Sequence, residues 1–242
     1  MRIKAFSVRC LKEILRDPLS LVFGIAFPLV LLFLMSAIQA NIPVAMFQIE
    51  RLAPGIAVFG LSFITLFSGS LIAKDRTSSF LTRLFASPMK SGEYIAGYTL
   101  PLLPAALMQS FICFAAAMLV GLKFSARILL CIAALIPSAL LFIAFGLLFG
   151  CIMSDKAVGG ISSILVNAAA WLSGIWFDLE LVGGVFKKIA YCLPFVHCVD
   201  AAKLALSGSC AGIGVHLAWI LGYAAVIFAA AVLCFSRKMK SL

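Results

Sequence analysis

Six long apolar runs constrain this chain more than any other feature of its sequence. They occupy residues 19–38, 55–73, 99–121, 128–153, 157–177 and 213–235. A helix needs about 20 apolar residues to cross the hydrocarbon core of a bilayer. The runs therefore predict an all-α polytopic membrane protein with six transmembrane helices, in a single domain over residues 1–242. Because only residues 154–156 separate the fourth run from the fifth, we expect a tight hairpin there.

The composition excludes a soluble protein. Apolar residues make up 64% of the chain and charged residues 12%, which leaves too little polar surface to cover a particle in water. A cytosolic enzyme, a disordered regulator and a nucleic-acid-binding module are excluded on this ground. The net charge of +10 then indicates anchoring at an anionic membrane face rather than contact with nucleic acid.

The distribution of the basic residues predicts the orientation. Thirteen of the 19 Lys and Arg residues fall on the side that carries both termini and the second and fourth loops, and six fall on the other side. Cytoplasmic loops carry the excess of positive charge in membrane proteins. Both termini are therefore predicted to be cytoplasmic, in a multi-pass protein of the inner or plasma membrane that is surrounded by the lipid bilayer.

Two segments outside the runs have helical patterns of their own. In residues 1–18, Phe6, Cys10 and Ile14 share one face and charged residues occupy the other, which predicts an amphipathic helix in the inner interface. The outer segment 178–211 contains two apolar pieces separated by Pro194. Pieces of about 10–14 residues are more often re-entrant or interfacial than spanning. We therefore expect a re-entrant helical pair on the outer side.

The second loop, residues 74–98, has an amphipathic core. Four apolar residues recur in it at helical spacing: Phe80, Leu81, Leu84 and Phe85. The dipeptide Ser87-Pro88 ends this pattern. Because so short a helix is marginal alone in water, it is expected to dock on the membrane surface or on another protein.

The spans lack the residues that catalysis or ion coupling would require. None of the six runs contains Lys, Arg, Asp or Glu, so the proton relays of secondary transporters are missing. The sequence has no G-x-S-x-G or H-E-x-x-H motif, no C-x-x-C pair and no P-loop. The chain is therefore predicted not to be an enzyme and to hold no metal or cofactor. Whether Cys192, Cys198 or Cys210 form a disulfide on the outer side stays open.

Aromatic and neutral polar residues of the spans are candidates for a translocation path. Phe59, Phe63 and Phe67 recur every four residues on the second span, and Asn167 and Trp171 lie four residues apart on the fifth. Costly polar groups such as the Asn167 amide should face other helices or a cavity. Packing between helices is the alternative to contact with cargo. If these residues do contact cargo, that cargo is apolar or amphipathic.

Small residues at the start of the fifth span predict a close contact. Gly159, Gly160 and Ser163 have little or no side chain, which lets a second helix approach. This stretch is predicted to form a helix–helix or subunit interface.

A further pattern follows the second span. It consists of Asp75-Arg76, Ser79, Phe80-Leu81, Arg83-Leu84, Ser87-Pro88 and Gly97. With it, residues 52–100 resemble the second span and coupling loop of ABC type-2 transporter permeases, the membrane subunits of ATP-binding-cassette exporters. The segment Leu193-Pro194-Phe195 and His197 is similar to a weaker pattern of the same family. The chain departs from the family at Ser79, where glycine is commoner, and at Thr77, where an acid is usual.

The resemblance implies a half-transporter that dimerises with a second copy or a paralogue and works with a separate ATP-binding subunit. ATP and Mg would bind that subunit, which would receive a coupling helix at residues 77–87. The implied contact residues are Asp75, Arg76, Phe80, Leu81, Arg83, Leu84, Phe85, Ser87 and Pro88. The implied function is a permease that moves a drug, lipid or peptide outward. A motor-independent transporter or channel, or a membrane scaffold that transports nothing, is the alternative.

Overall fold

The structure is a computed structural model that describes residues 2–18, 22–77, 90–209 and 211–240. Helices make up nearly all of these residues, and no strand occurs among them. The elements are α1 (Arg2–Arg16), the π-helical turn η1 (Val22–Ala26), α3 (Phe27–Asn41), the 3-10 turn η2 (Ala45–Phe47), α4 (Ile49–Ser62), α5 (Ile64–Thr77), α7 (Ser91–Leu119), α8 (Arg127–Ile152), α9 (Asp155–Leu172), α10 (Leu179–Val182), α11 (Gly184–Cys192), α12 (Pro194–Ser207) and α13 (Ile213–Lys240).

Five helical segments of the described chain are long and apolar enough to cross a membrane: Val22–Asn41, Ile49–Thr77, Ser91–Leu119, Arg127–Ile152 and Ile213–Arg237. The pair α11 and α12, bent by 79°, is a sixth candidate if it is counted as one broken span. The prediction of an all-α polytopic membrane protein is confirmed. The predicted fifth span, 157–177, corresponds to α9, which has 18 residues and ends at Leu172. Gly174 has a φ of 69°, which the residues of an α-helix do not adopt.

The loop predicted at residues 74–98 is shorter than the sequence suggested. Helix α5 continues to Thr77, and α7 begins at Ser91, eight residues before the predicted start of the third span. The Glu93 carboxylate accepts a hydrogen bond from the backbone N–H of Lys90 at 2.7 Å, which stabilises the first turn of α7. One side of these added turns packs into the core, where Tyr94 and Tyr98 are completely buried.

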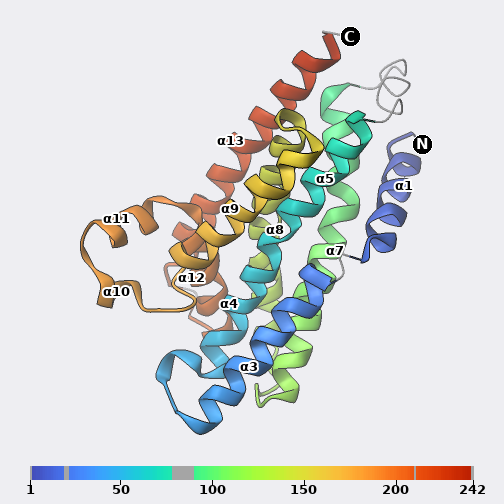
Figure 1. Cartoon of the computed structure of the whole chain (residues 1–242). Coiled ribbons are helices and arrows are strands. Elements are labelled where there is room, and N and C mark those ends of the chain that lie inside the picture. The colour runs from blue at the N-terminus through green and yellow to red at the C-terminus, as the bar shows by residue number, and fades with distance from the viewer. Residues whose placement is uncertain (1, 19–21, 78–89, 210, 241–242) are drawn as a thin grey trace.

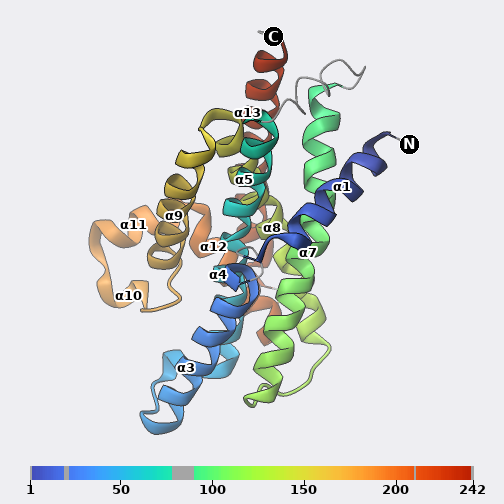
Figure 2. The same ribbon diagram turned by 45° about the vertical axis from the view of Figure 1, so that its right-hand side comes forward.

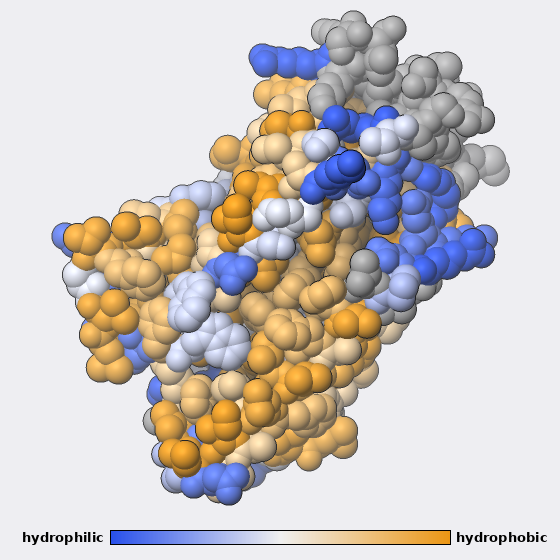
Figure 3. Space-filling view, in the orientation of Figure 1, coloured by the Kyte–Doolittle hydropathy of each residue, from blue (hydrophilic) through white to orange (hydrophobic). Residues whose placement is uncertain are grey.

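The helices run alternately up and down and bring both ends of the described chain to the same end of the bundle (Figure 1). The views in Figures 1 and 2 place α5 and α8 in the middle, with α1 and α7 on one flank and α9 on the other. The largest hydrophilic area of the visible surface lies at the end with the termini, whereas the flank is largely apolar (Figure 3). This distribution is that of a bundle whose sides face lipid.

A seam of glycines joins α5 and α8. A Cβ atom added to Gly146 would collide with the backbone of Thr65, and one added to Gly150 would collide with the backbone oxygen of Gly69. Only glycine therefore allows the two backbones to approach so closely. The seam also carries a hydrogen bond between helices, from Thr65 Oγ1 to the Phe142 carbonyl oxygen at 3.0 Å.

The outer segment divides into an exposed part and an inserted part. Helices α10 and α11 project sideways from the bundle (Figure 1), and Leu181 and Val185 on them are strongly exposed. Helix α12 packs among α4, α8 and α13. Cys192 is exposed and Cys198 is buried, and both are free thiols, while Cys210 lies outside the described residues.

Two histidines connect the inserted helix to the last span. His197 Nδ1 on α12 lies 2.8 Å from His216 Nδ1 on α13, and His197 Nε2 lies 3.0 Å from the Tyr191 carbonyl oxygen. A carbonyl oxygen only accepts, so His197 Nε2 carries a hydrogen. In the neutral pair His216 Nδ1 then donates to His197 Nδ1. The His197 ring also stacks on Trp219, with ring centroids 5.2 Å apart.

Candidate functional site

Two of the nine coupling residues implied by the sequence lie in the described chain, Asp75 and Arg76 at the end of α5. The other seven fall within residues 78–89, outside the described residues: Phe80, Leu81, Arg83, Leu84, Phe85, Ser87 and Pro88. On either side of the expected docking helix, the structure describes the ends of α5 and α7.

Asp75 is buried and holds three elements together. Arg9 of α1 donates to both carboxylate oxygens of Asp75, at 2.8 Å and 2.6 Å, and the Tyr98 hydroxyl of α7 donates to Oδ2 at 2.8 Å. We call Arg9, Asp75 and Tyr98 the terminal-end anchor. A bidentate arginine–carboxylate pair is among the strongest polar contacts in proteins. The hydrogen bond to Asp75 raises the pKa of the Arg9 guanidinium above its ordinary value, so Arg9 stays charged.

The same end of α5 also binds the end of α8. Arg76 Nη1 donates to the carbonyl oxygens of Gly150, Cys151 and Met153, at 2.7 Å, 2.8 Å and 2.9 Å. Gly150 and Cys151 are in the last turn of α8, and Met153 follows the helix directly. The end of a helix leaves carbonyl acceptors without partners, and positive charge is favourable there. Asp75 and Arg76 thus fix the helix that leads into residues 78–89 to α1, α7 and α8.

Helix α1 rests on α7 through a second small-residue contact. A Cβ atom on Gly97 would lie 2.5 Å from the Phe6 ring, and Ser7 Oγ donates to the Gly97 carbonyl oxygen at 3.0 Å. The Phe6 ring packs edge-on against Tyr98, with centroids 4.8 Å apart. Burial raises the pKa of the nearby Cys10 thiol to about 12, so this side chain is an uncharged packing residue. The amphipathic helix predicted for residues 1–18 is therefore seated on the bundle.

Four of the five predicted path residues meet in one groove, which lies between α3, α4 and α9. It has a volume of about 350 Å³, and its lining includes Phe59, Phe63, Asn167 and Trp171 together with Phe23, Phe27 and Trp176. We call these seven residues the aromatic groove. Its rings contact one another closely, with centroids 5.2 Å apart for Phe59 and Phe63 and 5.8 Å apart for Phe59 and Trp176.

The amide side chains of Asn167 and Gln109 have different surroundings. Asn167 is exposed in the groove and donates from Nδ2 to the Ser163 carbonyl oxygen at 2.8 Å. Gln109 is buried against Gly60, and its Oε1 has no hydrogen-bond partner. The groove therefore presents an amide side chain to whatever occupies it, whereas Gln109 is enclosed by the protein.

Phe67, the fifth predicted path residue, does not line the groove. The second span is divided at Phe63 into α4 and α5, where the Phe63 N–H bonds to the Gly60 carbonyl oxygen. Phe67, four residues after Phe63, therefore lies outside the groove and packs against Gly24. An uninterrupted helix would have kept the three phenylalanines on one face.

The predicted interface on α9 faces away from the bundle. A Cβ atom added to Gly159 or Gly160 would meet no atom of the described chain within 4 Å, and Ser163 is exposed. Ser163 also lines the aromatic groove. The small-residue face and the groove are therefore neighbouring parts of one open flank.

Sequence reasoning missed Arg9 and Tyr98 as partners of Asp75, because Arg9 is separated from it by 66 residues and neither belongs to a motif. An aspartate at the end of an apolar span was the available signal, since a buried carboxylate requires partners. In the described part of the chain, no group of three or more His, Cys, Asp or Glu side chains could hold a metal ion.

Comparison with known proteins gives one finding. The sequence model of the ABC-2 type transporter family matches residues 1–206. A search of curated proteins found no match to the chain.

Proposed function

The chain belongs to the ABC-2 type transporter family, and from this premise we propose that it is the permease half of an exporter driven by a separate ATP-binding subunit. As a family member it is a multi-pass membrane protein and a transport subunit, not a catalytic one. We further propose a docking site for the motor, a class of cargo, a surface for the second half and an orientation in the membrane.

The motor is proposed to dock on the loop helix at residues 77–87. The support lies at the base of that loop, where Asp75 and Arg76 connect α5 to three other helices. A movement of the loop would therefore be passed to α1, α7 and α8 together. ATP and Mg would bind the motor subunit.

The cargo is proposed to be apolar or amphipathic. The observation that best supports this function is the aromatic groove. Its lining combines six aromatic rings with one amide, and Trp171 in it is 56% exposed. Aromatic walls with few polar groups are typical of sites for apolar ligands. No charged side chain lines the groove in the described chain, so it is poorly suited to ions.

The second permease copy, or a paralogue, is proposed to bind the open flank at Gly159, Gly160 and Ser163. Two such flanks face to face would enclose the two grooves between the halves. Both termini, and with them the docking loop, are proposed to be cytoplasmic, because the basic residues gather at that end. Cargo entering the groove would then be moved outward.

The test is a detergent pull-down from the native membrane with two differently tagged copies of the chain. We expect an ATPase and the second tag to copurify with the wild type. Arg83→Glu should lose the ATPase and keep the second tag, because it reverses one charge at the proposed docking helix. Lys12→Glu, an exposed charge reversal on α1, is the matched control and should keep both.

Three outcomes contradict parts of the proposal. Loss of the ATPase with Lys12→Glu as well would show that general charge at this end, not the loop helix, attracts the motor. Absence of any ATPase from the wild-type sample, together with transport by the reconstituted chain alone, would favour a motor-independent transporter. Absence of the second tag would exclude a dimer of two identical copies, and absence of any second permease from the sample would exclude the paralogue as well.

A further inference from the structure

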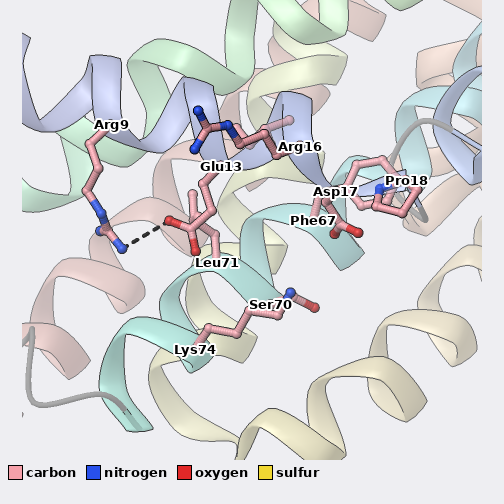
Figure 4. A pocket seen from close by; sticks show the side chains of 10 residues that line it. Arg9, Glu13, Arg16, Asp17, Pro18, Phe67, Ser70, Leu71 and Lys74 are labelled. Carbon is pink, nitrogen blue, oxygen red and sulfur yellow. Dashed lines mark ion pairs between the residues drawn. The ribbon is translucent and has the colours of Figure 1, made fainter.

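A second cavity, distinct from the aromatic groove, lies between α1 and α5. It has a volume of about 540 Å³ (Figure 4) and is lined by Arg9, Glu13, Ile14, Arg16, Asp17, Pro18, Phe67, Ser70, Leu71 and Lys74. One wall is contributed by the amphipathic helix and the other by the last turns of the second span. The cavity therefore lies where the interfacial helix meets the bundle.

One part of its lining is apolar and continues into the spanning region. Ile14 and Leu71 belong to the buried core, and the Phe67 ring packs against that core. Ile14 belongs to α1, whereas Phe67 and Leu71, which Figure 4 labels, both belong to α5. A ligand here can bury hydrocarbon on this wall at about 25 cal/mol for each Å² covered.

The other part of the lining is polar, and not all of its groups are in use. Arg9 pairs with Asp75 and, at 3.0 Å, with Glu13. In contrast, the Arg16 guanidinium, the Lys74 ammonium and the Ser70 hydroxyl have no hydrogen bond or ion pair among the described residues. Three donors, two of them cations, therefore line the same cavity without a hydrogen-bond or ion-pair partner among the described residues.

We propose that this cavity binds a membrane phospholipid, with its phosphate at Arg16, Lys74 and Ser70 and an acyl chain along Phe67 and Leu71. A phosphate accepts several charge-assisted hydrogen bonds, which are the contacts these three donors offer. A free phosphate would leave the apolar wall uncovered, so the lipid satisfies more of the lining. Glu13 and Asp17 on the same lining are acidic, so a zwitterionic headgroup meets less repulsion there than an anionic one. Only the leaflet of origin, the cytoplasmic one, rests on the proposed function.

The experiment measures lipid binding to the purified complex by native mass spectrometry in a mild detergent. The probes are phosphatidylethanolamine and a diacylglycerol with the same acyl chains, and inorganic phosphate is the competitor. Arg16→Gln combined with Lys74→Gln removes the two free cations. Lys12→Gln combined with Lys156→Gln removes two exposed cations that do not line the cavity. Ser70→Trp fills the cavity without changing its charge, and Ser70→Leu does so with less volume.

We expect the wild type to retain the phospholipid in preference to the diacylglycerol. At about 1 kcal/mol for each basic residue near a phosphate, the Arg16–Lys74 variant should bind roughly thirtyfold more weakly. The Lys12–Lys156 variant should stay within about twofold of the wild type, because its exposed cations do not line the cavity and are screened by salt. Both Ser70 variants should weaken binding while the melting temperature shows that they are folded.

Three results would overturn the proposal: equal weakening by the two double variants, equal retention of the diacylglycerol, or displacement of the lipid by millimolar phosphate. The last would assign the cavity to free phosphate. Copurification of the ATPase is recorded in the same samples. If the wild-type sample binds the phospholipid but contains no ATPase, the proposed function is rejected and the lipid site is retained.

Discussion

The terminal-end anchor and the aromatic groove use the same chain in opposite ways. In the anchor, every polar group has a partner inside the protein: Asp75 is only 2% exposed and receives hydrogen bonds from both Arg9 and Tyr98. In the groove, Trp171 is 56% exposed, and the exposed Asn167 amide donates its one hydrogen bond among the described residues to a carbonyl oxygen of its own helix. The anchor is completed by the fold, and the groove is left for something outside it.

This difference separates residues that maintain the fold from residues that are available for function. Burying a carboxylate is costly without partners, so the anchor contributes to the structure even if no motor is bound. Leaving a tryptophan and an amide exposed on an open flank gains nothing for a single chain. Variants of the two regions should therefore affect different quantities.

The largest effect on stability is expected from Asp75→Asn. The amide cannot accept both Arg9 donors as a charged carboxylate does, so the guanidinium loses its ion pair. Breaking a buried pair costs several kcal/mol, but Arg9 is 36% exposed and can be partly rehydrated. We expect a loss of about 2 kcal/mol, or about 4–8 °C in melting temperature for a chain of this size.

Thermal unfolding in detergent measures this loss, with Tyr98→Phe as the graded control. That variant removes one hydrogen bond and keeps the ion pair, so it should lower the stability by only about 1 kcal/mol. Equal losses of stability for the two variants, or no loss for Asp75→Asn, would show that the ion pair does not stabilise the packing of α1 on the bundle.

A smaller, pH-dependent effect is expected at the histidine pair between α12 and α13. The two Nδ1 atoms, 2.8 Å apart, can share one proton, but two would place N–H against N–H. The Tyr191 carbonyl oxygen keeps a hydrogen on His197 Nε2, so a further proton on this ring can only go to Nδ1, which faces His216. Protonation of both rings at low pH should therefore loosen α12.

The measurement is the melting temperature between about pH 7.5 and about pH 5, the range in which histidines take up protons. It should fall more steeply in the wild type than in His216→Gln, which cannot acquire the second charge, by an amount worth about 1 kcal/mol. Parallel curves for the two proteins would mean that the pair does not respond to acid.

The smallest effect on stability is expected in the groove, where function should change instead. Asn167→Ala and Trp171→Ala alter exposed side chains, so the free energy of unfolding should change by less than about 0.5 kcal/mol. Transport of an apolar or amphipathic probe by the reconstituted complex should fall. Phe59 and Phe63 are unsuitable for this purpose, because both are mostly buried and their truncation would also destabilise the core.

Unchanged transport in both exposed variants would remove the groove from the cargo path. A large loss of stability would instead show that the flank already has a partner that maintains the fold. Either result would break the distinction between the two regions.

Most of the helical architecture could be predicted from the sequence, because spans are defined locally by runs of apolar residues. The errors occurred where local signals conflict. The sequence predicted a loop as far as residue 98, but Glu93 and the buried Tyr94 and Tyr98 extend α7 backwards to Ser91. The repeat of Phe59, Phe63 and Phe67 assumed one straight helix, and the break at Phe63 turned the third ring elsewhere.

The candidate site was less predictable, because its contacts join distant parts of the chain. A motif marks Asp75 and Arg76, but it cannot show that Arg9 and the carbonyls of α8 bind them. The resemblance to a family gave the residues a role, and the structure gave them intramolecular partners. Gly97 had no physical explanation in the sequence, and the Phe6 ring beside it supplies one.

The uneven burial of the spans has a consequence for biosynthesis. In the most apolar window of Val22–Asn41 only 17% of the residues are buried, whereas in that of Ile49–Thr77 the share is 83%. The first helix can be released into lipid as it is made, but Thr65 on the second needs the Phe142 carbonyl, which is synthesised about 65 residues after Thr77. At about 5–20 residues per second, the second helix waits roughly 3–13 seconds for α8. During that interval a chaperone or the insertion machinery has to shield it.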